Sequence, residues 1–214
     1  MSRYGQLVET TVFLIRHGVT DWHRDQKVLG QRDVALNATG INQAQAAASA
    51  LSGVAVGEVL SSPLVRAVQT AEIIAGQFGI EVARDPRLTD FRVGKWEGMN
   101  YDEVAKSPEY QRFVADPLSD GIPGGEDMKQ IRERAVAAVE QALEDAPHGE
   151  SVVIVTHAGI VRVLLTYYLG SHPANYHRLR VAPGSVSVLS FADDRELPRV
   201  LATNWLGNIK DVLI

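Results

Sequence analysis

Consecutive apolar residues mark three strands that we expect to be buried on both faces. Residues 12–15 (Val-Phe-Leu-Ile) and 151–156 (Ser-Val-Val-Ile-Val-Thr) show no alternation of polar and apolar positions, and residues 58–61 form a shorter run. Such runs are typical of strands that helices cover on both sides of a parallel sheet. Two later runs, residues 186–191 and 200–205, flank a charged turn and predict a hairpin at one edge of the sheet.

Apolar residues at helical spacing predict four helices between these strands. They span residues 39–51, 63–78, 126–144 and 159–169. Pro63 fits the first turn of the second helix, because a proline there sacrifices no helical hydrogen bond. The first helix is rich in alanine, so we expect it to pack closely on the sheet. Its predicted apolar face is formed by Ile41, Ala44, Ala48 and Leu51.

The alternation of strands and helices predicts an α/β fold with a largely parallel sheet. Residues 91–125 interrupt this rhythm with two short helix-like pieces and a loop, and we interpret this segment as an inserted cap over a site. The chain contains no internal repeat, low-complexity tract or linker. Residues 1–214 are therefore expected to form a single domain.

Composition excludes several classes of function. The chain has 214 residues, of which 45% are hydrophobic and 22% are charged, so a sizeable core can form. A net charge of −5 argues against a polybasic nucleic-acid binder, and the absence of cysteine excludes disulfides and Cys-ligated metals. The first ten residues do not resemble a signal peptide, and no apolar run is long enough to span a bilayer. We therefore expect a soluble cytoplasmic protein that binds neither nucleic acid nor a membrane.

Three groups of reactive or polar residues follow three of the predicted strands. In an open α/β sheet, ligands bind beyond the carboxyl ends of the strands, so these groups are expected to meet at one edge. A histidine after a strand is more often a structural residue, but two histidines and two arginines at the same edge favour a catalytic site. The three groups are Arg16-His17-Gly18, residues 61–66 and His157-Ala158-Gly159.

These residue types suit the chemistry of a phosphate ester. The planar guanidinium groups of Arg16 and Arg66 match phosphate oxygens and neutralise their charge. A neutral imidazole can attack phosphorus, which leaves the second histidine to donate a hydrogen bond to the phosphate. Gly18 and Gly159 are expected to let backbone N–H groups approach the anion. The chemistry requires no metal, and none of the six histidines has HxH or HExxH spacing.

Four motifs in this order resemble the histidine phosphatase superfamily, in its phosphoglycerate-mutase-like branch. The resemblance covers nearly the whole chain and implies a three-layer α/β/α sandwich with a phosphohistidine intermediate on His17. It also implies a phosphate pocket of Arg16, Arg66 and His157, and a proton donor at Asp90. The motifs are Leu-Ile-Arg-His-Gly-Val-Thr (14–20), Ser-Ser-Pro-Leu-Val-Arg-Ala (61–67), Gly-Lys-Trp-Glu-Gly (94–98) and Thr-His-Ala-Gly (156–159).

The chain departs from the family pattern at four positions. The usual proton donor is Glu, so Asp90 is one methylene shorter. His23 and Leu29 stand where the family commonly has Asn and Gln, both of which help to bind phosphate; His23 is expected to replace one of these contacts. Ala158 follows His157 where Gly is more common, but its backbone N–H survives as a phosphate ligand.

Three functions remain open from the sequence. The leading hypothesis is a metal-independent phosphomonoesterase for a small phosphorylated metabolite, acting without a cofactor. A cofactor-dependent phosphoglycerate mutase is the first alternative, although residues 100–125 contain few basic groups for a second phosphate. A catalytically weak protein that binds phosphate esters is the second. The substrate and the oligomeric state are not encoded in any motif.

Four other polar residues receive structural interpretations. Arg162 lies five residues after His157, and we expect it to form a structural ion pair rather than to bind substrate. His148, His172 and His177 lie in polar or turn-like stretches and are expected to be solvated.

Overall fold

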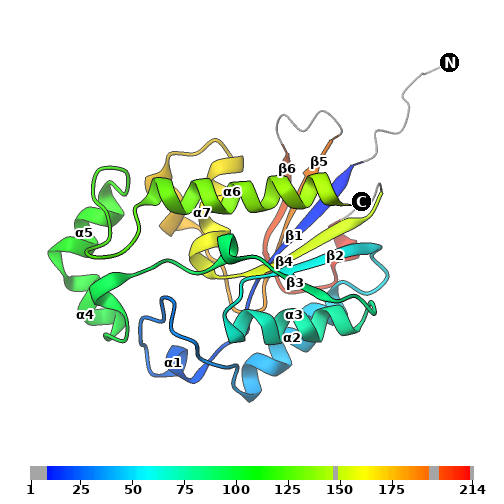
Figure 1. The fold of residues 1–214 in the computed structure, drawn as a ribbon, viewed down its shortest axis with the longest axis horizontal. Helices are drawn as coiled ribbons and strands as arrows, with labels where there is room; N and C mark the ends of the chain where they lie inside the picture. The colour runs from blue at the N-terminus through cyan, green and yellow to red at the C-terminus, as the bar shows by residue number, and fades with distance from the viewer. Residues whose placement is uncertain (1–8, 147–148, 193–197, 213–214) are drawn as a thin grey trace.

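A single mixed sheet of six strands, in the order β3-β2-β4-β1-β5-β6, forms the centre of the protein (Figure 1). The computed structural model describes residues 9–146, 149–192 and 198–212. The first four strands in this order are parallel, and β5 and β6 add an antiparallel hairpin at one edge. The strands are β1 (Thr10–Arg16), β2 (Val56–Ser61), β3 (Val82–Arg84), β4 (Ser151–Thr156), β5 (Val186–Phe191) and β6 (Arg199–Trp205).

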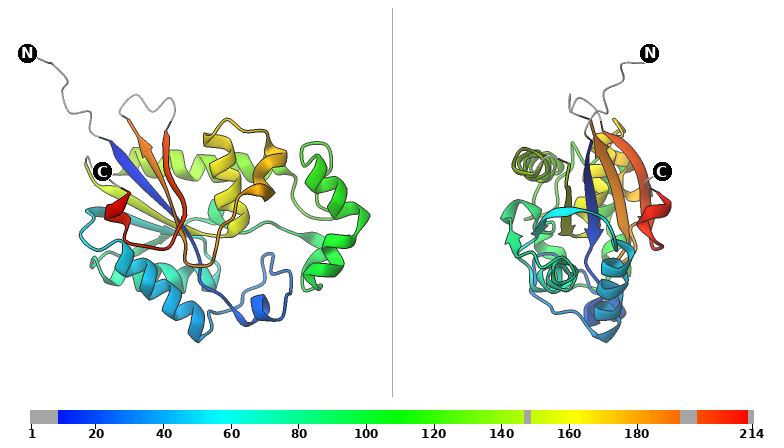
Figure 2. Two further views of the ribbon diagram at one scale, coloured as in Figure 1. Left: turned by 180° about the vertical axis from the view of Figure 1, so that it is seen from behind. Right: turned by 90° about the vertical axis from the view of Figure 1, so that its right-hand side faces the viewer.

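Helices cover both faces of the sheet, which gives three layers (Figure 1). On one side lie α2 (Ala38–Ala50) and α3 (Val65–Gly76), and on the other lie α6 (Met128–Asp145) and α7 (Ala158–Tyr168). The shorter helices α4 and α5 lie at the end of the molecule away from both termini (Figure 2). The short helical segments are α1 (Asp21–Arg24), α4 (Tyr101–Lys106), α5 (Pro108–Ala115), η1 (Pro86–Leu88), η2 (Gly94–Trp96), η3 (Pro173–Arg178) and η4 (Ile209–Asp211).

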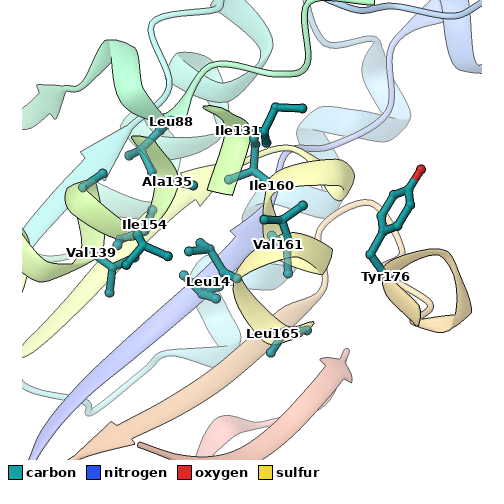
Figure 3. Packing of buried hydrophobic residues seen from close by; sticks show 14 of the residues in the cluster. Leu14, Leu88, Ile131, Ala135, Val139, Ile154, Ile160, Val161, Leu165 and Tyr176 are labelled. Carbon is teal, nitrogen blue, oxygen red and sulfur yellow. The ribbon is translucent and has the colours of Figure 1, made fainter. Parts of the chain in front are cut away.

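Burial on both faces explains why the central strands show no alternation. In β1, Val12 and Leu14 pack against α6 and α7, whereas Phe13 and Ile15 pack against α2 and α3. All four side chains are fully buried, and each contributes about 1.5–3 kcal/mol by leaving water. Figure 3 shows Leu14 among the apolar side chains of the first of these clusters.

Register within the sheet aligns the carboxyl ends of three strands. Arg16 at the end of β1 pairs with Thr156 at the end of β4, and Ser61 of β2 pairs with Val155. The residues that follow these strand ends therefore begin their loops side by side. This alignment creates the edge at which the predicted site residues meet.

Most predicted elements are confirmed, including all three buried strands, the four helices and the late hairpin. The turn predicted between the hairpin strands falls on residues 193–197, which lie outside the described part of the chain. The sequence did not indicate β3, because this edge strand has only three residues and two of them are exposed.

Two details of the predicted helices are wrong. Pro63 precedes α3, whose N-cap is Leu64, because the N–H of Ser62 still bonds to Val155 of β4 and the chain bends at Pro63 and Leu64 before the helix begins. Ile41 is 41% exposed, because the buried face of α2 is made of smaller residues. These are Gly40, Ala44, Ala47, Ala48 and Ala50.

Candidate active site

The ends of β1, β2 and β4 bring the predicted site residues together. His17 follows β1, and its ring centroid lies 5.1 Å from that of His157, which caps the N-terminus of α7. The centroid of the His23 ring lies 5.5 Å from that of His17. Ala158 is the first residue of α7, and Arg66 comes from the first turn of α3. Residues that are distant in sequence thus share one edge of the sheet.

His17 is held as a neutral imidazole. Its Nδ1–H donates to the carbonyl oxygen of Gly18 at 2.6 Å, so the lone pair lies on Nε2. Nε2 accepts a hydrogen bond from Nε of Arg66 at 3.3 Å. Burial, and then the positive charges of Arg66 and Arg16, hold the pKa of His17 well below its usual range. A neutral imidazole is the form that attacks an electrophile.

Arg66 is fully buried and fixed by the backbone of one loop. Its Nη1 donates to the Arg32 carbonyl at 2.6 Å and its Nη2 to the Gly30 carbonyl at 2.8 Å. Gly30 has a φ of +52°, and a side chain there would overlap the side chain of Val93. The loop therefore needs glycine at this position to bring its carbonyl groups to Arg66.

Arg16 has one guanidinium nitrogen without a protein partner. Its Nη1 donates to the Val181 carbonyl at 2.7 Å and its Nη2 lies 2.9 Å from Nε2 of His23. Its Nε is buried and has no hydrogen-bond partner among the described residues. Unpaired buried donors are costly, so this atom marks a place where a ligand atom can bind.

His23 supports Arg16 as a hydrogen-bond acceptor. A guanidinium only donates, so Nε2 of His23 accepts from Arg16, and Nδ1 of His23 lies 3.1 Å from the backbone nitrogen and 3.0 Å from Oγ1 of Thr20. Burial and the charges of Arg16 and Arg66 lower the pKa of His23 to about 4. His23 therefore contributes no positive charge at neutral pH.

His157 and Asp90 lie next to each other. Nε2 of His157 is 2.7 Å from Oγ of Ser62, and its Nδ1 is 3.6 Å from Oδ2 of Asp90. Burial, and then the charge of Arg66, lower the pKa of His157 well below its usual range. Asp90 accepts the Phe91 N–H at 2.9 Å on Oδ1, and its Oδ2 lies 3.4 Å from Nη2 of Arg66.

Burial sets the direction in which the pKa of Asp90 shifts, a balance that the sequence left open. Desolvation raises the pKa of Asp90 above its usual value, and the opposing effects of Arg66, the Phe91 N–H and Arg16 are smaller. Its side chain is still 20% exposed, so a ligand can reach it. A partly exposed carboxyl with a raised pKa is suited to proton donation.

Sequence reasoning missed the residues that position this group. Nη2 of Arg134 and Nε2 of Gln31 both donate to the Asp90 carbonyl, at 3.3 and 3.0 Å. Arg134 is itself held by an ion pair with Glu126 at 3.0 Å. Gln31 was detectable in the sequence because it directly follows Gly30, and Ser62, the neighbour of His157, was detectable because it lies in a recognised motif. Arg134 is one of several charged residues of α6, so the sequence gives no signal for it.

Neighbouring groups pack closely against both glycines beside the histidines, and the prediction fails for Gly18. The N–H of Gly18 donates to Oγ1 of Thr70 at 3.2 Å, so the prediction that it faces an anion is wrong. A side chain at Gly18 would overlap the backbone of Gly40 at the start of α2. At Gly159, an added Cβ would lie 2.9 Å from the ring of Phe91. Both positions need glycine because neighbouring groups pack against them.

Arg162 also differs from its prediction. In the described part of the chain it forms no ion pair; instead its Nε donates to the Leu179 carbonyl at 2.8 Å. His172 and His177 are exposed, as predicted, and His148 lies outside the described residues. The described residues include no group of three or more His, Cys, Asp or Glu that could hold a metal ion, and no helix among them is long and apolar enough to cross a membrane.

A family comparison agrees with this geometry. The sequence model of the histidine phosphatase superfamily (branch 1) matches residues 12–205, which include every site residue described above. The chain belongs to the histidine phosphatase superfamily. It is therefore an enzyme of this superfamily, and its three-layer α/β fold with antiparallel edge strands is the histidine phosphatase fold.

Related histidine phosphatases act on different small metabolites. "Probable phosphoglycerate mutase GpmB" of Escherichia fergusonii is 32% identical over 197 residues, covering 91% of this chain and 89% of that protein. A phosphoserine phosphatase from Entamoeba histolytica, solved with phosphoserine, is 25% identical with a TM-score of 0.81, covering 94% and 99% of the two chains. A mycobacterial glucosyl-3-phosphoglycerate phosphatase, solved with vanadate, is 26% identical with a TM-score of 0.82, covering 91% and 98%.

Proposed function

We propose that the protein is a metal-independent phosphatase that hydrolyses a small phosphomonoester through a phosphohistidine at His17. The observation that carries this proposal is the neutral imidazole of His17, whose unprotonated Nε2 accepts a hydrogen bond from Arg66 and lies near Arg16. This arrangement combines a nucleophile with two cations that neutralise a phosphate dianion. The phosphatases among the structural neighbours support the same reaction class.

The reaction has two steps. Nε2 of His17 forms a bond to phosphorus while the bond from phosphorus to the alcohol oxygen breaks, and Asp90 gives its proton to that oxygen. A water molecule then attacks phosphorus, its proton passes to Asp90, and the N–P bond breaks. Inorganic phosphate leaves, and both residues return to their starting forms.

The other site residues would stabilise the transferring group. Nε of Arg16 has no partner in the described structure, and Nδ1 of His157 is a second buried nitrogen without a hydrogen bond. Both would bind phosphate oxygens as charge moves onto them. His23 would keep the Arg16 fork in position, and the N–H of Ala158, at the positive end of α7, would supply a further donor.

Residues 91–125 would form the cap that selects the alcohol. They include η2, α4 and α5, and pack aromatic side chains against η3: the rings of Phe113 and Tyr176 are 6.0 Å apart. Phe113 is only 2% exposed, so it serves the packing of the cap. Tyr101 is 49% exposed and is the better position at which to alter substrate preference.

A phosphoglycerate mutase is the second candidate, and the name of the GpmB relatives favours it. A mutase returns the phosphoryl group from histidine to a second oxygen and must exclude water from the intermediate. A single assay separates the two functions: 3-phosphoglycerate is incubated with enzyme primed by 2,3-bisphosphoglycerate, and both 2-phosphoglycerate and inorganic phosphate are measured. The phosphatase proposal predicts phosphate release; isomerisation without phosphate release would replace it with the mutase.

A screen of phosphorylated metabolites for phosphate release tests the proposed activity directly. The His17→Ala protein serves as the blank, and Arg178→Gln, a change at an exposed arginine of η3, serves as the matched surface control. Phosphate release by the unchanged enzyme and by Arg178→Gln, but not by His17→Ala, is the expected result. Binding of esters with no release from any of them would instead favour the catalytically weak binding protein.

A further inference from the structure

Residues 181–185, which lead into β5, hold both the side chain and the backbone of Arg16. The carbonyl oxygen of Val181 accepts from Nη1 of Arg16 at 2.7 Å. The Gly184 N–H donates to the Arg16 carbonyl at 2.9 Å, and the Arg16 N–H donates to the Ser185 carbonyl at 3.2 Å. The position of the Arg16 guanidinium therefore depends on how this short segment is itself held.

A side chain of β6, which lies beside β5 at the edge of the sheet (Figure 1), holds the segment in place. Oδ1 of the half-buried Asn204 accepts the N–H of Ala182 at 2.6 Å. A backbone N–H can only donate, so the Asn204 atom that faces it is the amide oxygen. Asn204 is thus linked to residues 181–185 by a short and direct hydrogen bond.

The Ala182 N–H and the Val181 carbonyl belong to the same peptide unit. A trans peptide is planar, so these two groups point in opposite directions. The carbonyl accepts from Arg16 and the N–H donates to Asn204, so rotation of the peptide unit would break both bonds. Hydrogen bonds in such a chain also polarise one another, which strengthens the carbonyl as an acceptor. Asn204 therefore fixes the direction in which this carbonyl faces Arg16.

The backbone of β6 is shaped to present the Asn204 side chain. In the described part of the chain, Asn204 is one of two non-glycine residues with a positive φ, here +55°, a conformation that asparagine tolerates better than most residues. The register between β5 and β6 shifts beside it, between Val186 and Val188. Its own N–H donates to Oγ of the buried Ser187 at 3.2 Å. Irregular strand geometry of this kind redirects a side chain, here toward residues 181–185.

We propose that Asn204 is a positioning residue for Arg16 and acts through the peptide unit between Val181 and Ala182. Arg16 is held at both ends of its fork, by Val181 at Nη1 and by His23 at Nη2, and its Nε is left without a partner among the described residues. Asn204 secures the first of these two contacts and thereby the direction of Nε. The consequence for phosphate binding rests on the proposed function, whereas the positioning of Arg16 does not.

Two substitutions at Asn204 separate its hydrogen bond from its backbone conformation. Asn204→Gly removes the acceptor of the Ala182 N–H and keeps a residue that tolerates a positive φ, so the fold should survive. Asn204→Asp keeps an oxygen acceptor and also tolerates this conformation. Asn208→Gly is the matched control, because it removes a similar bond, from the Lys210 N–H to Oδ1 of Asn208 at 3.0 Å, at the exposed cap of η4.

NMR of the whole protein without any ligand tests the positioning directly. Exchange spectroscopy with ¹⁵N labelling measures how fast the Arg16 guanidinium rotates about its Nε–Cζ bond. One hydrogen bond corresponds to about 2- to 10-fold, so Asn204→Gly should speed this rotation by that factor. Asn204→Asp and Asn208→Gly should leave the rate unchanged. An unchanged rate in Asn204→Gly, or an equal increase in Asn208→Gly, would overturn the proposal.

Calorimetry with inorganic phosphate tests the consequence for the site. Asn204→Gly should weaken phosphate binding by about 2- to 10-fold, and Asn204→Asp should weaken it less. In a protein that also carries Arg16→Met, Asn204→Gly should have no further effect, because a residue that acts through Arg16 cannot act without it. Equal weakening with and without Arg16→Met would show a general structural effect and would overturn the proposal.

The two readouts separate this proposal from the proposed function. If Asn204→Gly speeds the rotation of Arg16 but neither this change nor Arg16→Met weakens phosphate binding, Arg16 is not a phosphate ligand and the positioning role stands. If Arg16→Met weakens phosphate binding but Asn204→Gly does not, the positioning role fails and the proposed function stands.

Discussion

Replacing Asp90 by asparagine removes the proposed proton donor and keeps the shape of its side chain. The asparagine oxygen can still accept the Phe91 N–H, which lies 2.9 Å from Oδ1. Gln31 and Arg134 bind the backbone carbonyl of residue 90, so their contacts also remain. The change therefore removes the acidic proton, together with the carboxylate oxygen that faces Nη2 of Arg66 at 3.4 Å, and leaves the backbone contacts of residue 90 in place.

The size of the effect depends on the leaving group. An alkyl alcohol leaves as a strongly basic alkoxide unless an acid protonates it, whereas p-nitrophenolate is a stable anion. General acid catalysis contributes about 10²–10⁴-fold, so Asp90→Asn should lower kcat/KM by that factor for glycerol 3-phosphate. For p-nitrophenyl phosphate the loss should be about tenfold or less in the first chemical step.

Steady-state kcat/KM for the two esters, measured at pH 6–8, tests this expectation. Equal losses for both, or no loss for either, would refute the assignment of Asp90 as the donor. In that case Glu97, whose carboxylate pairs with Arg32 at 3.0 Å, and His23 would be the next positions to change.

The same variant makes a prediction about stability. The pKa of Asp90 is raised from its usual 3.8 in the folded protein, so folding favours its protonated form. The stability that the protonated Asp90 contributes is fully present below pH 3.8 and is lost as the pH rises through the raised pKa of the folded protein. Asp90→Asn should therefore be more stable than the original protein at pH 7 and lose this advantage at low pH. Urea unfolding at several pH values measures the difference, and a less stable variant at pH 7 would contradict it.

Three further predictions concern the metal, the glycines and His23. Activity should survive EDTA and be inhibited by orthovanadate, whereas complete loss that one divalent ion restores would contradict the metal-free mechanism. Gly18→Ala should destabilise the protein by about 1–3 kcal/mol, because its Cβ would overlap Gly40. Gly76→Ala, with open space around it, should change the stability by less than about 1 kcal/mol, and thermal unfolding compares the two variants. His23→Ala should weaken inhibition by phosphate about tenfold by removing the 2.9 Å acceptor of Arg16, and His23→Asn should weaken it less; equal inhibition in all three proteins would refute this role.

The fold was predictable because its signals are local and repeated along the chain. Unbroken apolar runs gave the buried strands, and polar residues directly after them gave His17 and His157 as neighbours. β3 was not predictable, since two of its three residues are exposed and only pairing with β2 makes it a strand. Ile41 was misjudged because the closeness of α2 to its neighbours, and not hydropathy alone, decides which side of it is buried.

In the candidate site, the positions of the main residues were predictable from the sequence, but charge states and contacts were not. Arg16, Arg66 and His157 were predictable from motif and position. The charge state of Asp90 was not, because it depends on how far burial outweighs three nearby arginines. Arg162 was misassigned for a related reason: its lack of a carboxylate partner in the described structure is a property of the fold around it and leaves no trace in sequence.

The most direct test of the central claim is to trap the phosphoenzyme. Asp90→Asn should slow the attack of water, because Asp90 accepts the proton of that water, so the intermediate should accumulate with p-nitrophenyl phosphate. After an alkaline quench, mass spectrometry of the digested protein should find the phosphoryl group on His17, in an amount that matches the burst of nitrophenolate. A phosphoryl group on His157, or a burst with unmodified His17, would contradict the mechanism.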